Sequence, residues 1–151
     1  MNKPEMASNI LGGDYNCAQA VARTYADSVG ADLEQLSNTA AAFGGGIGRK
    51  GHVCGAVTGA SMIIGLKMAP LLKNDPLIKD KIYEVTQEFM QRFAAKHDTV
   101  LCRELIKYEI DTPQKLEAAK ETGVFDTQCK MYVHDAAEIL EEMLTNGVPY
   151  E

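Results

Sequence analysis

The chain has 151 residues, of which 46% are hydrophobic and 24% are charged, values typical of a folded domain that can bury its own core. Its net charge of −6 and isoelectric point near 5.1 argue against a sequence-independent nucleic-acid binder, which needs a basic face. The longest uncharged run, Val53 to Leu66, has 14 residues and is too short to span a bilayer. The N-terminal segment lacks the continuous apolar core of a targeting signal. We therefore expect one cytoplasmic domain, residues 1–151, with no nucleic-acid or membrane partner.

Apolar spacing and capping residues predict helices along almost the whole chain. Asp14 and Asp32 are the expected N-caps of the first two helices, and Thr112 with Pro113 begins a later one. The predicted helices cover residues 15–29, 32–43, 52–72, 77–96, 100–107, 113–121 and 127–145. No segment shows sustained β alternation, and no repeat or linker divides the chain. The expected fold is all-α, a compact single-domain bundle of six to seven helices with a Gly-rich loop between the second and third.

Two of these helices show which face should be buried. In residues 77–96 the apolar side chains recur on one face, with most charged ones elsewhere; they are Ile78, Ile82, Val85, Phe89 and Phe93. In residues 127–145 the expected inward side chains are Tyr132 or Val133, Ala136, Leu140 and Met143. Both helices should therefore contribute to the core.

Four cysteines are the main chemical feature of the chain: Cys17, Cys54, Cys102 and Cys129. In a reducing compartment they are more often metal ligands or redox thiols than structural disulfides. No CxxC or CxxCH motif occurs, which argues against a thioredoxin-like motif, a zinc ribbon and covalent c-type haem. The cysteines must therefore be brought together by the fold if they act together.

Each cysteine follows a plausible N-cap by three residues. The pairs are Asp14 and Cys17, Gly51 and Cys54, Thr99 and Cys102, and Asp126 and Cys129. All four should then lie in the first turn of a helix, where unpaired N–H groups and the helix dipole lower a thiol pKa. We predict that these four helix starts meet at one site. The alternative is that each cysteine simply fills the core, as buried free cysteines often do.

The stretch from Phe43 to Leu66 joins a Gly-rich turn to an uncharged helix that begins near Cys54. Gly55 and Gly59 are spaced to let another backbone approach closely, and we favour tight packing over direct ligand contact for them. Arg49 could offset the negative charge of thiolates or could be a solvated loop cation. His52 could act as a ligand or proton donor, although a capping or surface role is the commoner one.

Several standard sites are excluded by context. The sequence FGGGIGRKG is not a P-loop, because the lysine is followed by Gly51 rather than by Ser or Thr. The loose GxGxxG match has no βαβ unit around it. Neither HExxH nor GxSxG occurs.

The motif Cys54-Gly55-Ala56-Val57-Thr58-Gly59, together with the three other cysteines, resembles the C_GCAxxG_C_C family of redox-active proteins. The resemblance extends from about Leu11 to Leu144. Domains of this type are also similar to the non-haem iron–sulfur portion of split-Soret cytochromes, which implies that some members bind an iron–sulfur cluster through these thiolates. The haem portion has no counterpart in this sequence.

From the resemblance and the residues we predict a small redox protein in which all four cysteines hold an iron–sulfur cluster for electron transfer. Arg49 would compensate charge, and Gly55 and Gly59 would border the cofactor and allow close packing. One alternative is a metal-free thiol–disulfide protein with Cys54 as the low-pKa attacking thiol. Another is a structural zinc site closed by the four thiolates. The redox partner is open, and the apolar helices permit a homodimer.

Overall fold

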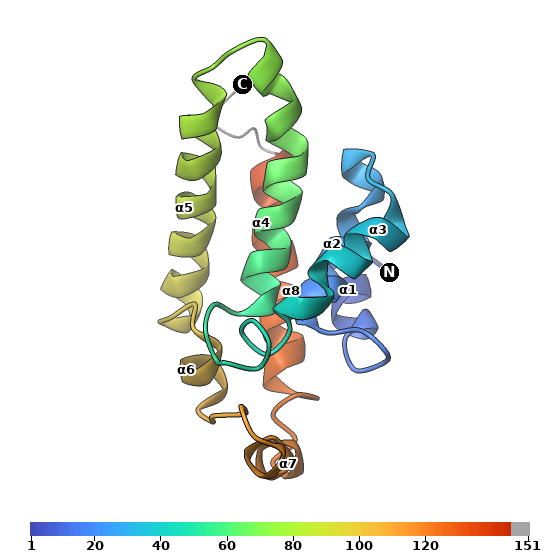
Figure 1. The fold of residues 1–151 in the computed structure, drawn as a ribbon, viewed down its shortest axis with the longest axis vertical. Helices are drawn as coiled ribbons and strands as arrows, with labels where there is room; N and C mark the ends of the chain where they lie inside the picture. The colour runs from blue at the N-terminus through green and yellow to red at the C-terminus, as the bar shows by residue number, and fades with distance from the viewer. Residues whose placement is uncertain (146–151) are drawn as a thin grey trace.

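A computed structural model describes residues 1–145 of the chain (Figure 1), and within this range the chain is helical and contains no strand. The all-α prediction is confirmed. Residues 1–145 form eight α-helices, rather than six or seven, together with three short 3₁₀ helices. In chain order they are α1 Lys3–Ile10, α2 Cys17–Tyr25, η1 Asp27–Val29, α3 Leu33–Ala40, η2 Ala41–Phe43, α4 Gly55–Met68, η3 Ala69–Lys73, α5 Ile78–His97, α6 Cys102–Ile106, α7 Pro113–Glu121 and α8 Gln128–Thr145.

Helix α1 was not predicted, although its signals are present in the sequence. The side chain of Asn2 accepts a hydrogen bond from the Glu5 N–H at 2.9 Å, and Pro4 lies in the first turn, both typical of a helix start. The helix packs against α2 and α8 and buries Ala7 completely. Its eight residues are too few to form a stable helix alone, so tertiary packing decides its existence.

The predicted cap of α2 was wrong. Asn16, not Asp14, caps this helix: its side chain accepts from the Gln19 N–H at 2.9 Å, and the Gln19 side chain accepts from the Asn16 N–H at 3.0 Å. This reciprocal capping box satisfies two N–H groups at once. The caps at Asp32 and Thr112 are confirmed by hydrogen bonds from the N–H groups three residues later.

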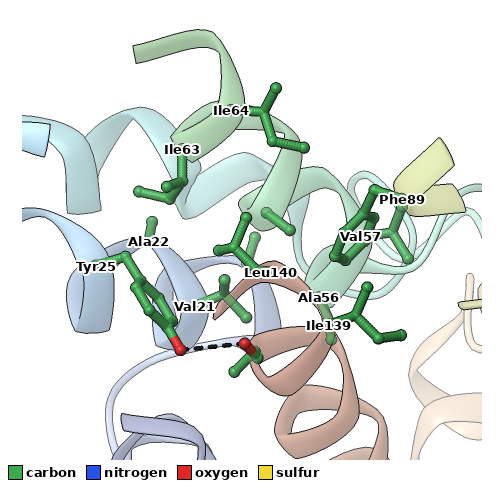
Figure 2. Close-up of a cluster of buried hydrophobic side chains, with 14 of the residues drawn as sticks. Val21, Ala22, Tyr25, Ala56, Val57, Ile63, Ile64, Phe89, Ile139 and Leu140 are labelled. Carbon is green, nitrogen blue, oxygen red and sulfur yellow. Dashed lines mark hydrogen bonds between the residues drawn. The ribbon is translucent and has the colours of Figure 1, made fainter. Parts of the chain in front are cut away.

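Helix α4 lies at the centre of the molecule and packs against α2, α5 and α8. Figure 2 shows its side chains among those of the neighbouring helices, and the Tyr25 hydroxyl donates to the carbonyl of Ala137 at 3.1 Å. The α2–α4 contact depends on Gly59, where an added Cβ would lie 2.6 Å from the Ala18 carbonyl oxygen. Glycine at this position therefore sets how closely the two helices approach.

The expected inward faces of the two long helices are confirmed, except that one residue of α5 is only half-buried. Ile78, Val85, Phe89 and Phe93 of α5 are buried, whereas Ile82 packs at the edge of the core. The buried residues of α8 include Tyr132, Val133, Ala136, Leu140 and Met143.

The segment Gly55–Lys73 is apolar and long enough to cross a membrane by length and composition, and 44% of its most apolar window is buried within the fold. A core helix meets the same criteria, and α4 makes the contacts of one. The prediction of no membrane partner was based on the 14-residue uncharged run from Val53 to Leu66, which is shorter than this segment. It stays a prediction.

Two hydrophobic clusters divide the interior. The main core is formed by α2, α4, α5 and α8 with α1 and α3. A smaller satellite cluster joins α6, α7 and the start of α8; its buried members are Cys102, Ile106, Ile110, Ala119 and Val124. In Figure 1, α7 lies at the lower end of the molecule, and α6 lies below the start of α4 at the level of the first turns of α8.

Candidate functional site

All four cysteines line one pocket of about 510 Å³. The pocket lies where the two hydrophobic clusters meet. Cys54 belongs to the main core and Cys17 packs against it, whereas Cys102 belongs to the satellite cluster and Cys129 packs against that one. All four are free thiols. The fold thus brings residues that are far apart in sequence to one place.

The cysteines also lie at four helix starts, as predicted. Cys17 and Cys102 are the first residues of α2 and α6, and Cys129 is the second residue of α8. Cys54 occupies the N-cap position of α4 itself.

The expected caps at Gly51 and Thr99 were wrong. Leu101 holds the N-cap position of α6 without a side-chain hydrogen bond, and the hydroxyl of Thr99 accepts from the Leu101 N–H at 3.1 Å. The N–H of Gly51 donates to the Gly45 carbonyl within the loop. The extended backbone before Cys54 and Cys102 delays both helix starts.

A short antiparallel bridge between Val53 and Leu101 aligns two of the cysteines. The Cys54 N–H donates to the Val100 carbonyl at 2.8 Å, and the Cys102 N–H donates to the His52 carbonyl at 2.6 Å. These two N–H groups are therefore not available to their own thiols. A bridge of one residue per strand has no sequence period, so sequence reasoning could not have found it.

The Gly-rich loop, residues 44–51, folds back on itself beside the pocket. Gly45, Gly46, Gly48 and Gly51 have positive φ angles, which only glycine adopts without strain. An added Cβ at Gly46 would lie 2.7 Å from the Cβ of Cys102, and one at Gly55 would overlap the sulfur of Cys17. Glycines at these two positions allow the backbone to approach the thiols closely.

Cys17 is the most acidic of the four thiols. The Cys54 thiol, acting as a hydrogen-bond donor to the Cys17 sulfur, together with the backbone N–H groups of Gly45 and Ala18, outweighs burial and lowers the pKa of Cys17 to about 7. Hydrogen bonds donated to a thiolate stabilise its charged form and therefore lower the pKa of the thiol. Cys17 therefore carries substantial negative charge near neutral pH.

The other three thiols are held in the neutral form. The pKa of Cys54 is raised well above its ordinary value, mainly because its thiol donates a hydrogen bond to Cys17 and next because the thiol is buried. The pKa values of Cys102 and Cys129 are raised to about 12, mainly by burial and to a smaller extent by the negative charge of Cys17. The alternative in which Cys54 is the low-pKa thiol is not supported by these shifts, because its hydrogen bond to Cys17 and its burial outweigh the Ala56 N–H that lowers its pKa.

The remaining candidates have different positions. Arg49 lines the pocket and its side chain is largely exposed. Gly55 and Gly59 lie in the α2–α4 contact, in keeping with the packing role favoured from the sequence, and Gly55 lies directly against the Cys17 sulfur. Their role as cofactor-binding residues stays a prediction. His52 is exposed and contributes its backbone rather than its ring.

Sequence reasoning missed Tyr132 and Lys120 as pocket residues. Tyr132 donates from its hydroxyl to the Leu105 carbonyl at 2.9 Å and packs edge-on against the ring of His97 at 4.9 Å between centroids. Its inward position on α8 was the available signal. Lys120 lines the pocket from the last turn of α7, and no sequence pattern marks it.

Within residues 1–145, no three His, Cys, Asp or Glu side chains are grouped closely enough to hold a metal ion. The four sulfurs thus surround a pocket rather than converge on one point.

The family model described as "Putative redox-active protein (C_GCAxxG_C_C)" matches residues 15–143. The chain belongs to this family. The match includes all four cysteines and the CGAxxG motif, and it agrees with the resemblance inferred from the sequence. No curated protein and no solved structure matches this C_GCAxxG_C_C protein in the comparisons.

Proposed function

We propose that the pocket is a redox centre in which the four thiolates bind an iron–sulfur cluster for electron transfer. The observation that supports it best is that Cys17, Cys54, Cys102 and Cys129 all line one pocket. Four thiolates are the usual ligand set of such clusters. A simple core-filling role gives no reason for four cysteines from four helix starts to share one cavity.

The residues around the sulfurs fit this group. Backbone N–H groups of Gly45 and Ala18 face the Cys17 sulfur, and such donors stabilise the charge on ligating sulfurs and tune the reduction potential. Leu105 and Ile106 give the pocket apolar walls that limit the access of water. Arg49 offsets negative charge. When bound, a cluster supplies one-electron transfer, and we expect the partner to be a redox protein or small redox molecule.

A closed zinc site is less well supported. Zinc requires four sulfurs about 2.3 Å from a single point, and within the part of the chain that the structure describes no such group is formed. A cluster holds its four sulfurs around a larger inorganic unit than a single ion, which suits four cysteines that line a pocket.

A thiol–disulfide function is the second candidate, supported by the contact between the Cys17 and Cys54 thiols. In this reaction the Cys17 thiolate attacks one sulfur of a substrate disulfide; the substrate S–S bond breaks, its other sulfur leaves as a thiolate, and a Cys17–substrate mixed disulfide forms. Cys54 gives its proton to that thiolate and attacks the Cys17 sulfur, so that the mixed disulfide breaks, the second substrate sulfur leaves as a thiolate that takes a proton from water, and a Cys17–Cys54 disulfide forms. The Cys17–Cys54 pair is oxidised by two electrons and the substrate is reduced by two.

Anaerobic purification followed by iron, sulfide and zinc analysis and a visible spectrum tests the proposal. We expect iron with sulfide and charge-transfer absorption, and we expect this signal to be lost when any of the four cysteines is replaced by serine. Met131→Ser is the matched control, because it removes an exposed sulfur from α8 two residues after Cys129.

Three results would contradict a cluster. Zinc without iron would support the structural site, and metal-free protein with a reversible Cys17–Cys54 disulfide would support thiol exchange. Retention of the iron signal in the cysteine variants would show that the metal is bound elsewhere.

A further inference from the structure

The pocket that the four cysteines line is larger than a site for four thiols requires. Its volume of about 510 Å³ falls within the range of about 300–1,000 Å³ typical of small-molecule sites. Beyond the cysteines, its wall continues along apolar side chains of the satellite cluster, including Ile110, Leu116 and Phe125. A compact metal centre closed by thiolates has no use for this second apolar surface.

Two cations from different elements also line the pocket. Arg49 comes from the Gly-rich loop, and Lys120 comes from the last turn of α7. Neither forms an ion pair within residues 1–145. Asp126 is the acidic residue of the lining, and the Cys17 thiolate adds negative charge to it. Among the described residues, the two cations therefore lie at the pocket without an acidic side chain in ion-pair contact, in a chain whose net charge is −6.

We propose that the pocket binds a small organic anion, with its apolar body against Ile110, Leu116 and Phe125 and its carboxylate or phosphate at Arg49 and Lys120. An apolar wall that also carries a few polar groups is the general pattern of a small-molecule site. The position beside the thiols makes this molecule the substrate or effector of the redox centre. The role as substrate or effector rests on the proposed redox function, whereas the binding of the anion to the pocket does not.

The test uses three probes of similar size and different charge: benzoate, benzamide and benzylammonium. Each is titrated into the isotope-labelled full-length protein, and backbone amide shifts are followed by NMR. We expect benzoate to shift signals of pocket-lining residues in the millimolar range and to bind at least about threefold more tightly than benzamide, with benzylammonium weakest.

Charge variants locate the anion. Arg49→Gln and Lys120→Gln should each weaken benzoate binding by about two- to fivefold and leave benzamide binding unchanged, whereas Arg49→Lys should retain most of it. Lys73→Gln is the control, because η3 follows the 14-residue α4 and lies about 20 Å along that helix from Cys54. Equal binding of benzoate and benzamide, or an equal effect of the Lys73 change, would overturn the proposal.

Iron and sulfide are measured on the same samples, so that the two proposals can fail separately. Iron-containing protein that does not bind benzoate at the pocket would refute the anion site and leave the cluster intact. Metal-free protein that binds benzoate with the expected charge dependence would support the anion site alone.

Discussion

At the scale of single residues, the site is asymmetric although its four ligands are chemically identical. Cys17 receives hydrogen bonds from the Cys54 thiol and from the Gly45 and Ala18 N–H groups. The N–H groups of Cys54 and Cys102 are instead used in the backbone bridge to Val100 and His52. The thiol pKa values therefore follow the direction of the Cys54–Cys17 hydrogen bond and the burial of each thiol, rather than the helix-start position that all four cysteines share.

This asymmetry predicts selective labelling of Cys17. In the reduced, metal-free protein, iodoacetamide should alkylate Cys17 with a half-labelling pH near 7, because the thiolate forms as the pH rises through the pKa. Cys102 and Cys129, whose pKa is raised to about 12, should label much more slowly at pH 8. Peptide mass spectrometry over pH 5–9 measures each residue, and four equal pH profiles would contradict the assignment.

Replacing Cys54 tests the origin of the low pKa of Cys17. Cys54→Ala removes the donor that lowers it most, so the half-labelling pH of Cys17 should rise by about one unit. Cys54→Ser keeps a hydroxyl donor and should leave the midpoint closer to that of the wild type. If alanine and serine had the same effect, the hydrogen bond from residue 54 would not be the cause.

At the scale of elements, close helix contact and capping hold the cysteine-bearing helix starts in place. Helix α2 is fixed at its first turn by the Asn16 capping box and along its length by Gly59 of α4. The Asn16 side-chain amide also donates to the Ala41 carbonyl at 2.9 Å, which ties α2 to the start of the Gly-rich loop. Cys17 is positioned by both contacts.

Two glycines of α4 should respond oppositely to substitution by alanine. Gly59→Ala places a Cβ 2.6 Å from the Ala18 carbonyl oxygen, part of a backbone that cannot easily move, and should destabilise the protein by about 1–3 kcal/mol. Gly65→Ala meets nothing within 4 Å and should stabilise it by up to about 1 kcal/mol. Urea unfolding measures both, and similar values for the two variants would disprove the tight α2–α4 contact.

The capping box links stability to the site. Asn16→Ala should cost about 1–2 kcal/mol in urea unfolding and should raise the half-labelling pH of Cys17, because the first turn of α2 loosens. Asn2→Ala is the matched control: it removes the N-cap of α1, should cost about 1 kcal/mol or less, and should leave Cys17 unchanged. A shift of Cys17 labelling in the Asn2 variant as well would point to a global effect.

At the scale of the whole molecule, the four cysteines lie on both sides of the boundary between two hydrophobic clusters. Cys17 and Cys54 are attached to the main core, and Cys102 and Cys129 are attached to the satellite cluster with α7. Any group held by all four sulfurs would therefore join the two clusters. Metal binding and the docking of α7 should be coupled.

Removal of the metal should loosen α7 selectively. We expect amide hydrogen exchange in Pro113–Glu121 to be at least about tenfold faster in the metal-free protein than in the iron-loaded protein, since a bound group stabilises the segments it joins. Exchange in α5, Ile78–His97, which carries none of the four cysteines, provides the internal control and should change less. Equal protection of α7 in the two forms would mean that the four sulfurs do not hold the clusters together.

The sequence by itself determined the helical class, the inward faces of α5 and α8, the caps at Asp32 and Thr112, the family and the position of the cysteines at helix starts. These features depend on apolar periodicity and hydrogen bonds between residues that are only a few positions apart. The cap of α2 was also local, but two neighbouring candidates led to the wrong choice at Asp14, and the existence of α1 depends on its packing against α2 and α8.

Only the tertiary structure decided which thiol is acidic and how the pocket is formed. The low pKa of Cys17 requires Cys54 and Gly45, residues 37 and 28 positions away along the chain. The bridge between Val53 and Leu101 and the presence of Lys120 in the pocket likewise join distant segments. Such contacts leave no period or spacing in the sequence, because they depend on how packed helices bring their ends together.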